Sequence, residues 1–227
     1  KEATGISGSD IKEFDSKAEK IGLHSKIDDL LTGKKVNYTE GLAAWHPKYR
    51  KEAMINENDN GVYDPFDTGT DYDKGIKLQE LYDLCMSSKN IVTIGIGGSF
   101  EGPKMLLEAI EASLNQDPLD IFGGKRKYIF ITGSDLTEFK IKTKGLNPKD
   151  TLFFISSKSF TTEETITILK EAISFSSDMN RFIAITANKS EAKKYNINNI
   201  IEFDKEIGGR YSIWSDISVL IKWLAPY

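Results

Sequence analysis

The 227-residue sequence predicts an α/β fold: a three-layer αβα sandwich around a five-stranded parallel sheet, with a helical N-terminal extension. From residue 90 onward, short and almost continuously apolar runs alternate with longer amphipathic runs, as in consecutive βαβ units. Strands that are covered by helices on both faces need apolar residues at nearly every position. Residues 1–86 lack this alternation, so we expect an extension and connecting segment over 1–86 and a sheet domain over 87–227.

Composition restricts the class of protein. With 39% hydrophobic and 28% charged residues, the chain can bury one sizeable core. Its net charge of -4 is spread over dispersed acidic and basic residues, which argues against nucleic acid or a membrane surface as a partner. A single cysteine, Cys85, suits a reducing compartment and is expected in the core. No run is long and apolar enough to span a membrane, so we expect a cytoplasmic protein.

Two amphipathic helices are expected in residues 1–86. Asp10 and Glu13 have the spacing of a capping box ahead of the first helix, and the second covers about residues 78–85. Between them, residues 56–75 are acidic and rich in turn-forming residues, which indicates an exposed connection. The asparagines of this stretch loosely resemble a calcium loop, but Pro65 within it argues against one.

Five strands are expected in the sheet domain. Each is a short apolar run that ends where a helical pattern begins, at residues 90–96, 127–132, 151–156, 181–186 and 199–203. Apolar residues recur at helical spacing between them, for example at Leu106, Ala109 and Ile110 and at Ile166, Leu169 and Ile173. Ligands of open parallel sheets bind beyond the carboxyl ends of the strands, so the strand-to-helix junctions are the places to look for chemistry.

The first such junction is "GIGGSFEGPK" at residues 95–104. Its glycines, Gly97 and Gly98 among them, let the backbone approach a ligand closely, and Ser99 adds a hydroxyl. Phe100 stands where a dinucleotide-binding fingerprint has its third glycine. A tight turn that simply needs glycine explains this segment about as well as a ligand site does.

The third strand runs into "SSKSFTTEET", where four hydroxyls precede a helix that starts near Glu163: those of Ser157, Ser159, Thr161 and Thr162. Unpaired amides and the positive end of the helix dipole attract anions at such a start, so the cluster indicates a phosphate site. Lys158 is expected to contribute its backbone rather than its charge. The alternative is that Thr161 only caps the helix, with Glu164 completing a capping box. A cap needs one hydroxyl and leaves the other three unexplained.

The third segment is "EIGGRYSIWSDIS", at residues 206–218. Gly208 and Gly209 precede Arg210, whose permanent charge and forked donors suit an oxyanion. Such an arginine can stabilise charge that develops during a reaction. A surface arginine that pairs with Asp204 or Glu206 is the ordinary alternative.

These three segments, in this order, resemble the N-terminal sugar-isomerase (SIS) domain of the glucose-6-phosphate isomerase, or phosphoglucose isomerase, family. Residues 37–46, "NYTEGLAAWH", are similar to the segment that leads into that domain. The resemblance implies that Ser157, Ser159 and Thr162, with the backbone around Lys158, hold the sugar phosphate. It implies that Arg210 stabilises an enediolate intermediate. It also implies a substrate pocket with no metal or cofactor, lined by Gly97, Gly98, Ser99, Glu164 and Gly209.

The resemblance further implies a cytoplasmic homodimer of glycolysis and gluconeogenesis that interconverts glucose 6-phosphate and fructose 6-phosphate. The family has Asp, Thr and Gln at the positions of Phe100, Ser159 and Glu163, and arginine at that of Leu42. Its glutamate base and ring-opening histidine lie beyond the matched region, and we expect His24 and His46 to be ordinary histidines. We therefore expect an N-terminal part that binds a phosphosugar and is inactive by itself.

Two alternatives remain open at this point. A non-catalytic SIS module would bind a phosphosugar and regulate another process. A nucleotide-binding Rossmann protein would use the glycine turn, with Asp135 as its only candidate ribose ligand, although Asp135 fits the N-cap of a helix better.

Overall fold

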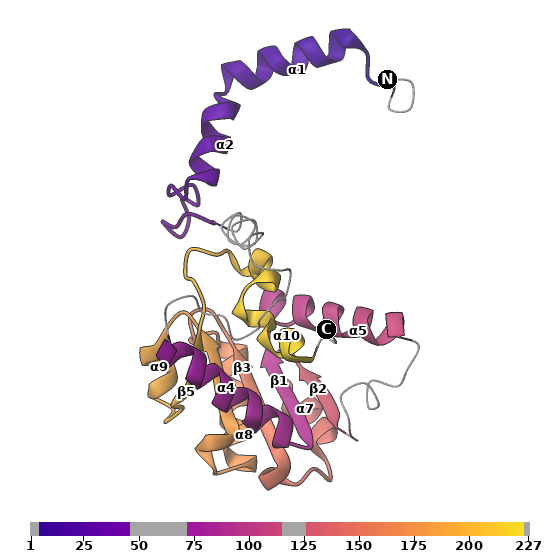
Figure 1. Cartoon of the computed structure of the whole chain (residues 1–227), viewed down its shortest axis with the longest axis vertical. Helices are drawn as coiled ribbons and strands as arrows, with labels where there is room; N and C mark the ends of the chain where they lie inside the picture. Colours follow the sequence, from indigo (N-terminus) through magenta and orange to yellow (C-terminus); the bar gives the residue numbers. More distant parts are fainter. Residues whose placement is uncertain (1–4, 46–71, 115–125, 225–227) are drawn as a thin grey trace. The chain divides into compact units, whose positions relative to one another are not determined.

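The computed structural model describes residues 5–45, 72–114 and 126–224 (Figure 1). Internal contacts divide the chain into two units. One comprises residues 1–58 and 206–208, and the other comprises residues 59–205 and 209–227. Within the described residues, no helix has the length and apolar character that crossing a membrane requires.

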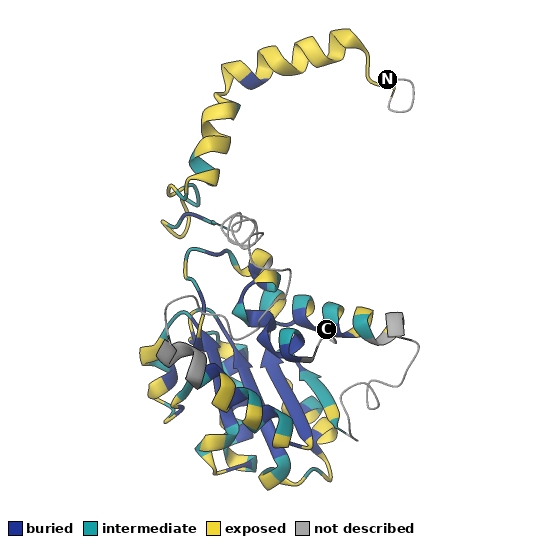
Figure 2. Cartoon of the chain, in the orientation of Figure 1, coloured by how far each residue is buried: buried dark blue, intermediate teal, exposed yellow. Residues whose placement is uncertain are grey.

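The first unit contains helices α1 (Gly8–Lys20) and α2 (Leu23–Leu31), whose residues are almost all exposed (Figure 2). The predicted capping box of α1 was wrong by one turn, because it is formed by Ser7 and Asp10. The Asp10 amide donates to the Ser7 hydroxyl, and the Ser7 amide donates to the Asp10 carboxylate at 2.8 Å. Glu13 lies inside the helix instead and pairs with Lys17. Ser7 directly precedes the helix, so its short hydroxyl can accept from a free amide of the first turn, whereas Asp10 already lies within that turn.

The second unit is built on five parallel strands in the order β2-β1-β3-β4-β5. The predicted strands are confirmed to within one residue at every end: β1 (Asn90–Gly95), β2 (Lys127–Ile131), β3 (Thr151–Ser156), β4 (Phe182–Thr186) and β5 (Asn199–Glu202). Every residue of β1, β3 and β4 is buried. Their continuously apolar sequences therefore reflect helices on both faces of the sheet.

In the part of the chain that the structure describes, six helices cover the two faces and complete the predicted three-layer sandwich. Successive strand residues point to opposite faces, so Phe154 packs into one core and Phe153 into the other. The first core is covered by α4 (Tyr72–Ser87), α5 (Glu101–Leu114) and α10 (Val219–Leu224). The second is covered by α7 (Leu136–Thr143), α8 (Glu163–Phe175) and α9 (Lys189–Lys193). Helix α4, which lies within the predicted extension, thus packs on the sheet.

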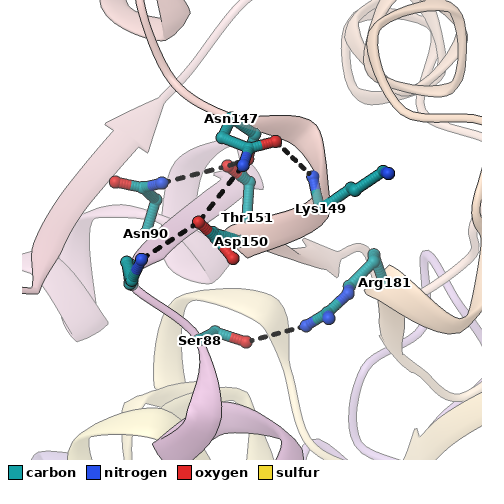
Figure 3. A network of polar contacts seen from close by, with 8 residues as sticks. Ser88, Asn90, Asn147, Lys149, Asp150, Thr151 and Arg181 are labelled. Carbon is teal, nitrogen blue, oxygen red and sulfur yellow. Dashed lines mark hydrogen bonds and ion pairs between the residues drawn. The ribbon is translucent and has the colours of Figure 1, made fainter.

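Polar side chains join the amino ends of the central strands (Figure 3). The Thr151 hydroxyl accepts a hydrogen bond from the buried Asn90 amide at 3.2 Å and donates to the Asn147 carbonyl at 2.8 Å. Lys89 and Asp150 form an ion pair beside it at 3.3 Å. These contacts satisfy the buried side chains of Asn90 and Thr151 and tie the starts of β1 and β3 together.

Cys85 is fully buried in the core beneath α4, as predicted, and burial raises the pKa of its thiol to about 12. We expect no reaction with a thiol reagent at pH 8 until urea unfolds the chain. The unfolded thiol loses its proton near pH 8.5, whereas the folded one keeps it until about pH 12. The stabilisation is therefore complete below pH 8.5 and falls by about 1 kcal/mol per pH unit above it. Urea unfolding at pH 7, 9 and 10 measures this slope.

Cys85→Ala is the control, because it removes the thiol and leaves every other titrating group in place. Its unfolding free energy should lose the part of the pH dependence that belongs to the thiol. Equal slopes in the two proteins, or rapid labelling of the native chain, would contradict the assignment of a buried, protonated thiol.

Candidate functional site

The carboxyl ends of β1 and β3 form the switch point of the sheet. From β1 the chain continues to β2 on one side, and the next strand, β3, is added on the other side of β1. Gly95 at the end of β1 lies opposite Ser156 at the end of β3. Ligands of doubly wound sheets bind in the crevice at such a point. The glycine turn and the hydroxyl cluster leave the sheet here, so the structure brings two predicted segments together.

The glycine turn after β1 contains a short helix, η2 (Gly97–Ser99). The backbone requires glycine at two positions, one at the end of β1 and one in η2. A Cβ atom on Gly95 would lie 3.1 Å from the Ser99 carbonyl oxygen and 3.2 Å from the Ser156 carbonyl oxygen. Gly97 has a φ of +56°, in the left-handed region that glycine favours. The turn thus passes close to the end of β3, and Gly98 and Ser99 are half-buried beside it.

The loop after β3 is held by its own hydroxyls. Ser157 is buried, and its Oγ accepts from the Phe160 amide at 3.1 Å and lies 3.2 Å from Thr162 Oγ1. Ser159 Oγ accepts from the amide and the hydroxyl of Thr161, at 3.2 and 2.8 Å. Phe160 has a φ of +55°, which is unfavourable for an aromatic residue, and its buried ring anchors the turn in the core.

Helix α8 begins at Glu163, as predicted, without a side-chain cap. Thr162 is the N-cap residue and makes no capping hydrogen bond. The alternative in which Thr161 caps the helix with Glu164 is therefore wrong, since the Thr161 hydroxyl donates to Ser159 instead. An α-helix leaves its first amides without intrahelical partners, and no side chain from the N-cap occupies them here. The loop thus places hydroxyls beside free amides and the positive end of the helix.

The third segment lies against the glycine turn. Arg210 belongs to the short helix η5 (Gly209–Trp214), although its side chain lies outside the described part of the chain. Ser212 Oγ donates to the Gly209 carbonyl at 2.6 Å and lies 3.5 Å from the Gly98 carbonyl. A Cβ on Gly102 would come within 3.0 Å of the Ile213 side chain, so η5 also packs tightly on the start of α5. The backbone that carries Arg210 is therefore fixed beside Gly98.

The sequence patterns did not identify two residues of this region. Ser212 fixes the turn that carries Arg210, and Thr186 at the end of β4 contacts the loop after β3. Thr186 is the last residue of a buried strand, and Ser157 directly follows one, so a hydroxyl at the end of a buried strand is the signal that could have identified Thr186. Among the described residues, no group of three or more His, Cys, Asp and Glu side chains could hold a metal ion.

The sequence allows two roles for Asp135, ribose ligand and N-cap, and the structure shows the N-cap. Its carboxylate accepts from the Thr137 amide at 2.7 Å at the start of α7. Phe100, at the position of the third fingerprint glycine, is buried and packs edge-on against Phe130. The close helix–strand approach that a third glycine allows in dinucleotide-binding folds is therefore not made here.

Comparisons with known proteins agree on one family. The family model described as phosphoglucose isomerase matches residues 4–225. The chain is 33% identical to a glucose-6-phosphate isomerase of Wigglesworthia glossinidia brevipalpis over 93% of its length, and 31% identical to one of Neurospora crassa over 92%. It spans 40% of the length of each of these relatives.

Solved structures show the same fold. A glucose-6-phosphate isomerase from Chlamydia trachomatis superposes with a TM-score of 0.68 at 19% identity, over 96% of this chain and 43% of that one. A hypothetical protein from Thermus thermophilus superposes with a TM-score of 0.52 at 20% identity, over 79% of this chain and 43% of that one.

Proposed function

The chain belongs to the phosphoglucose isomerase family, and on this premise we propose that it is the phosphosugar-binding part of an isomerase that interconverts glucose 6-phosphate and fructose 6-phosphate. The single observation that carries the proposal is the uncapped start of α8, which lies beside the hydroxyls of Ser157 and Thr162 at the switch point of the sheet. A phosphate has the charge that this helix end attracts and the acceptor oxygens that hydroxyls and amides can satisfy.

In the proposed complex, Ser157, Ser159 and Thr162 and the backbone around Lys158 hold the phosphate. Neutral donors can do so without burying an unpaired cation. The half-buried Glu164, with Gly97, Gly98, Ser99 and Gly209, lines the sugar side of the pocket. Glu163 is exposed, so its carboxylate can turn to water and away from the anion.

Arg210 serves the chemical step in this proposal. An aldose–ketose conversion moves a proton between two adjacent carbons through an enediolate, whose oxygen carries negative charge. A guanidinium aimed at that oxygen stabilises the transition state more than the ground state, and one well-placed donor is worth about 3 kcal/mol. The family resemblance implies neither metal nor cofactor, and the proposal includes none. We propose a cytoplasmic homodimer for the whole enzyme, acting in glycolysis and gluconeogenesis.

Titration of the 227-residue chain with three compounds tests the proposal. Glucitol 6-phosphate supplies the phosphate, 6-phosphogluconate adds an anion at the position of the enediolate, and NAD tests the dinucleotide alternative. We expect both sugar phosphates to shift the amide resonances of residues 157–164, and NAD to leave them unchanged. Shifts with NAD alone, or none with either sugar phosphate, would rule the proposal out. Isomerase turnover by these 227 residues should stay far below that of a full-length relative.

A further inference from the structure

Thr186, the last residue of β4, holds the loop that follows β3. Its side chain is fully buried, and its Oγ1 donates to the Lys158 carbonyl at 3.1 Å and accepts from the Asn188 amide at 3.0 Å. The Ala187 amide donates to the same Lys158 carbonyl at 3.1 Å. The Lys158 carbonyl therefore receives two hydrogen bonds from the end of β4, although Lys158 lies beyond the end of β3.

These two bonds also orient the amide of the next residue. The carbonyl of Lys158 and the N–H of Ser159 belong to one planar peptide group, which is trans, so they point in opposite directions. β3 lies between β4 and β1 in the sheet. A carbonyl that points to β4 therefore turns the Ser159 N–H toward the side of β1, where the glycine turn leaves the sheet.

Within the described residues, the Ser159 N–H donates no hydrogen bond, so this donor is available to a ligand. The hydrogen bonds of Ser159 in this part of the chain are those that its Oγ accepts from Thr161. Ser157 holds the other end of this short loop, because its amide donates to the Ile185 carbonyl at 3.1 Å. One fixed and unpaired donor thus lies between the hydroxyls of Ser157 and Thr162.

We propose that Thr186 is a positioning residue for the phosphosugar: it fixes the Lys158–Ser159 peptide so that the Ser159 N–H is already aimed at a phosphate oxygen. The inference rests on the proposed function and adds a residue that does not touch the ligand. A donor that is fixed before binding avoids the entropic cost of ordering it in the complex. The last residue of β4 and the residue after it provide the two bonds, so the end of the fourth strand controls a site that lies between the first and the third.

The Thr186→Val variant tests this role, because valine keeps the shape of threonine and removes the hydroxyl. The Lys158 carbonyl keeps the bond from Ala187 but gains freedom to rotate. We expect the affinity of the 227-residue chain for glucitol 6-phosphate to fall about tenfold, which is the effect of one charge-assisted hydrogen bond. Thr186→Ser restores the hydroxyl and should bind within about twofold of the original chain.

Thr143→Val is the matched control for loss of stability. Thr143 is also buried, and its hydroxyl donates to a backbone carbonyl, that of Phe139 at 2.7 Å, within α7. Each substitution removes a buried hydroxyl that donates to a backbone carbonyl, and Thr186→Val also removes the acceptor of the Asn188 amide. We therefore expect Thr143→Val to lower the unfolding free energy by somewhat less than Thr186→Val does, and to leave the affinity for glucitol 6-phosphate unchanged.

A spectroscopic measurement distinguishes positioning from a purely structural role. In the original chain, glucitol 6-phosphate should shift the Ser159 amide proton downfield, as a hydrogen bond to phosphate does. At ligand saturation, this shift should be smaller in Thr186→Val and restored in Thr186→Ser. An unchanged affinity and amide shift in Thr186→Val would overturn the inference and leave the proposed function intact. An equal loss of affinity in Thr143→Val would also overturn it, whereas failure of the original chain to bind refutes the proposed function itself.

Discussion

Replacing Thr162 with aspartate is expected to weaken the binding of a hexose 6-phosphate by more than 100-fold and, at the same time, to stabilise the chain. Thr162 occupies the N-cap of α8 without capping it. Aspartate is a stronger N-cap and carries the charge that a helix start favours, which together are worth about 1 kcal/mol. The same carboxylate would occupy the amides that we assign to the phosphate and would repel its charge. Two effects of opposite sign follow from one substitution.

Calorimetric titration with glucitol 6-phosphate and thermal unfolding measure these two effects. Ser174→Asp provides the control, because it adds the same charge to an exposed position in the last turn of the same helix. We expect Ser174→Asp to bind within about twofold of the original chain and to be slightly less stable, since a negative charge opposes the helix dipole at that end. Unimpaired binding by Thr162→Asp would mean that the phosphate does not use this helix start.

The Phe153→Ala variant is expected to lose about 3 to 5 kcal/mol of unfolding free energy. Phe153 lies in the middle of β3 and is fully buried. Its ring stacks on that of Phe182 with centroids 4.9 Å apart and meets Phe175 edge-on at 6.0 Å. Truncation removes these contacts and leaves a cavity between two strands and a helix, where the surrounding backbone cannot close fully.

Urea unfolding measures the loss, and Phe14→Ala is the control. Phe14 lies on α1 with 61% of its surface exposed, so the same truncation there should change the unfolding free energy by less than about 0.5 kcal/mol. A loss below 1 kcal/mol for Phe153→Ala would contradict the packing of the second core. Because the ring lies four residues before Ser157, we expect a weaker phosphate site as well.

The sheet could be predicted from the sequence because burial on both faces leaves a simple signal. A strand such as Thr151–Ser156 has apolar side chains at its four central positions, and its end is marked by the hydroxyls that follow. The capping boxes were harder to predict, since Asp10 and Thr161 have the right residue type but not the right position. Choosing among adjacent Ser, Thr and Asp residues requires the backbone dihedrals, and the short-range sequence pattern does not contain them.

The sequence predicts individual residues of the candidate site but not which of them are neighbours in space. Ser157, Ser99 and Arg210 each follow a strand, so parallel topology predicts that they share one edge of the sheet. Strand order decides which of them are neighbours, and it depends on contacts between distant segments. Thr186 and Ser212 act through backbone carbonyls of other segments, which no local pattern reveals. The conformation of Phe160 at positive φ is likewise set by the core that holds its ring.

A crystal structure of the chain soaked with glucitol 6-phosphate tests the central claim most directly. The account predicts phosphate oxygens within about 3 Å of the Ser157 and Thr162 hydroxyls and of the Ser159 N–H, at the amino end of α8. A phosphate bound elsewhere on the chain, with these hydroxyls still bonded only to one another, would contradict it.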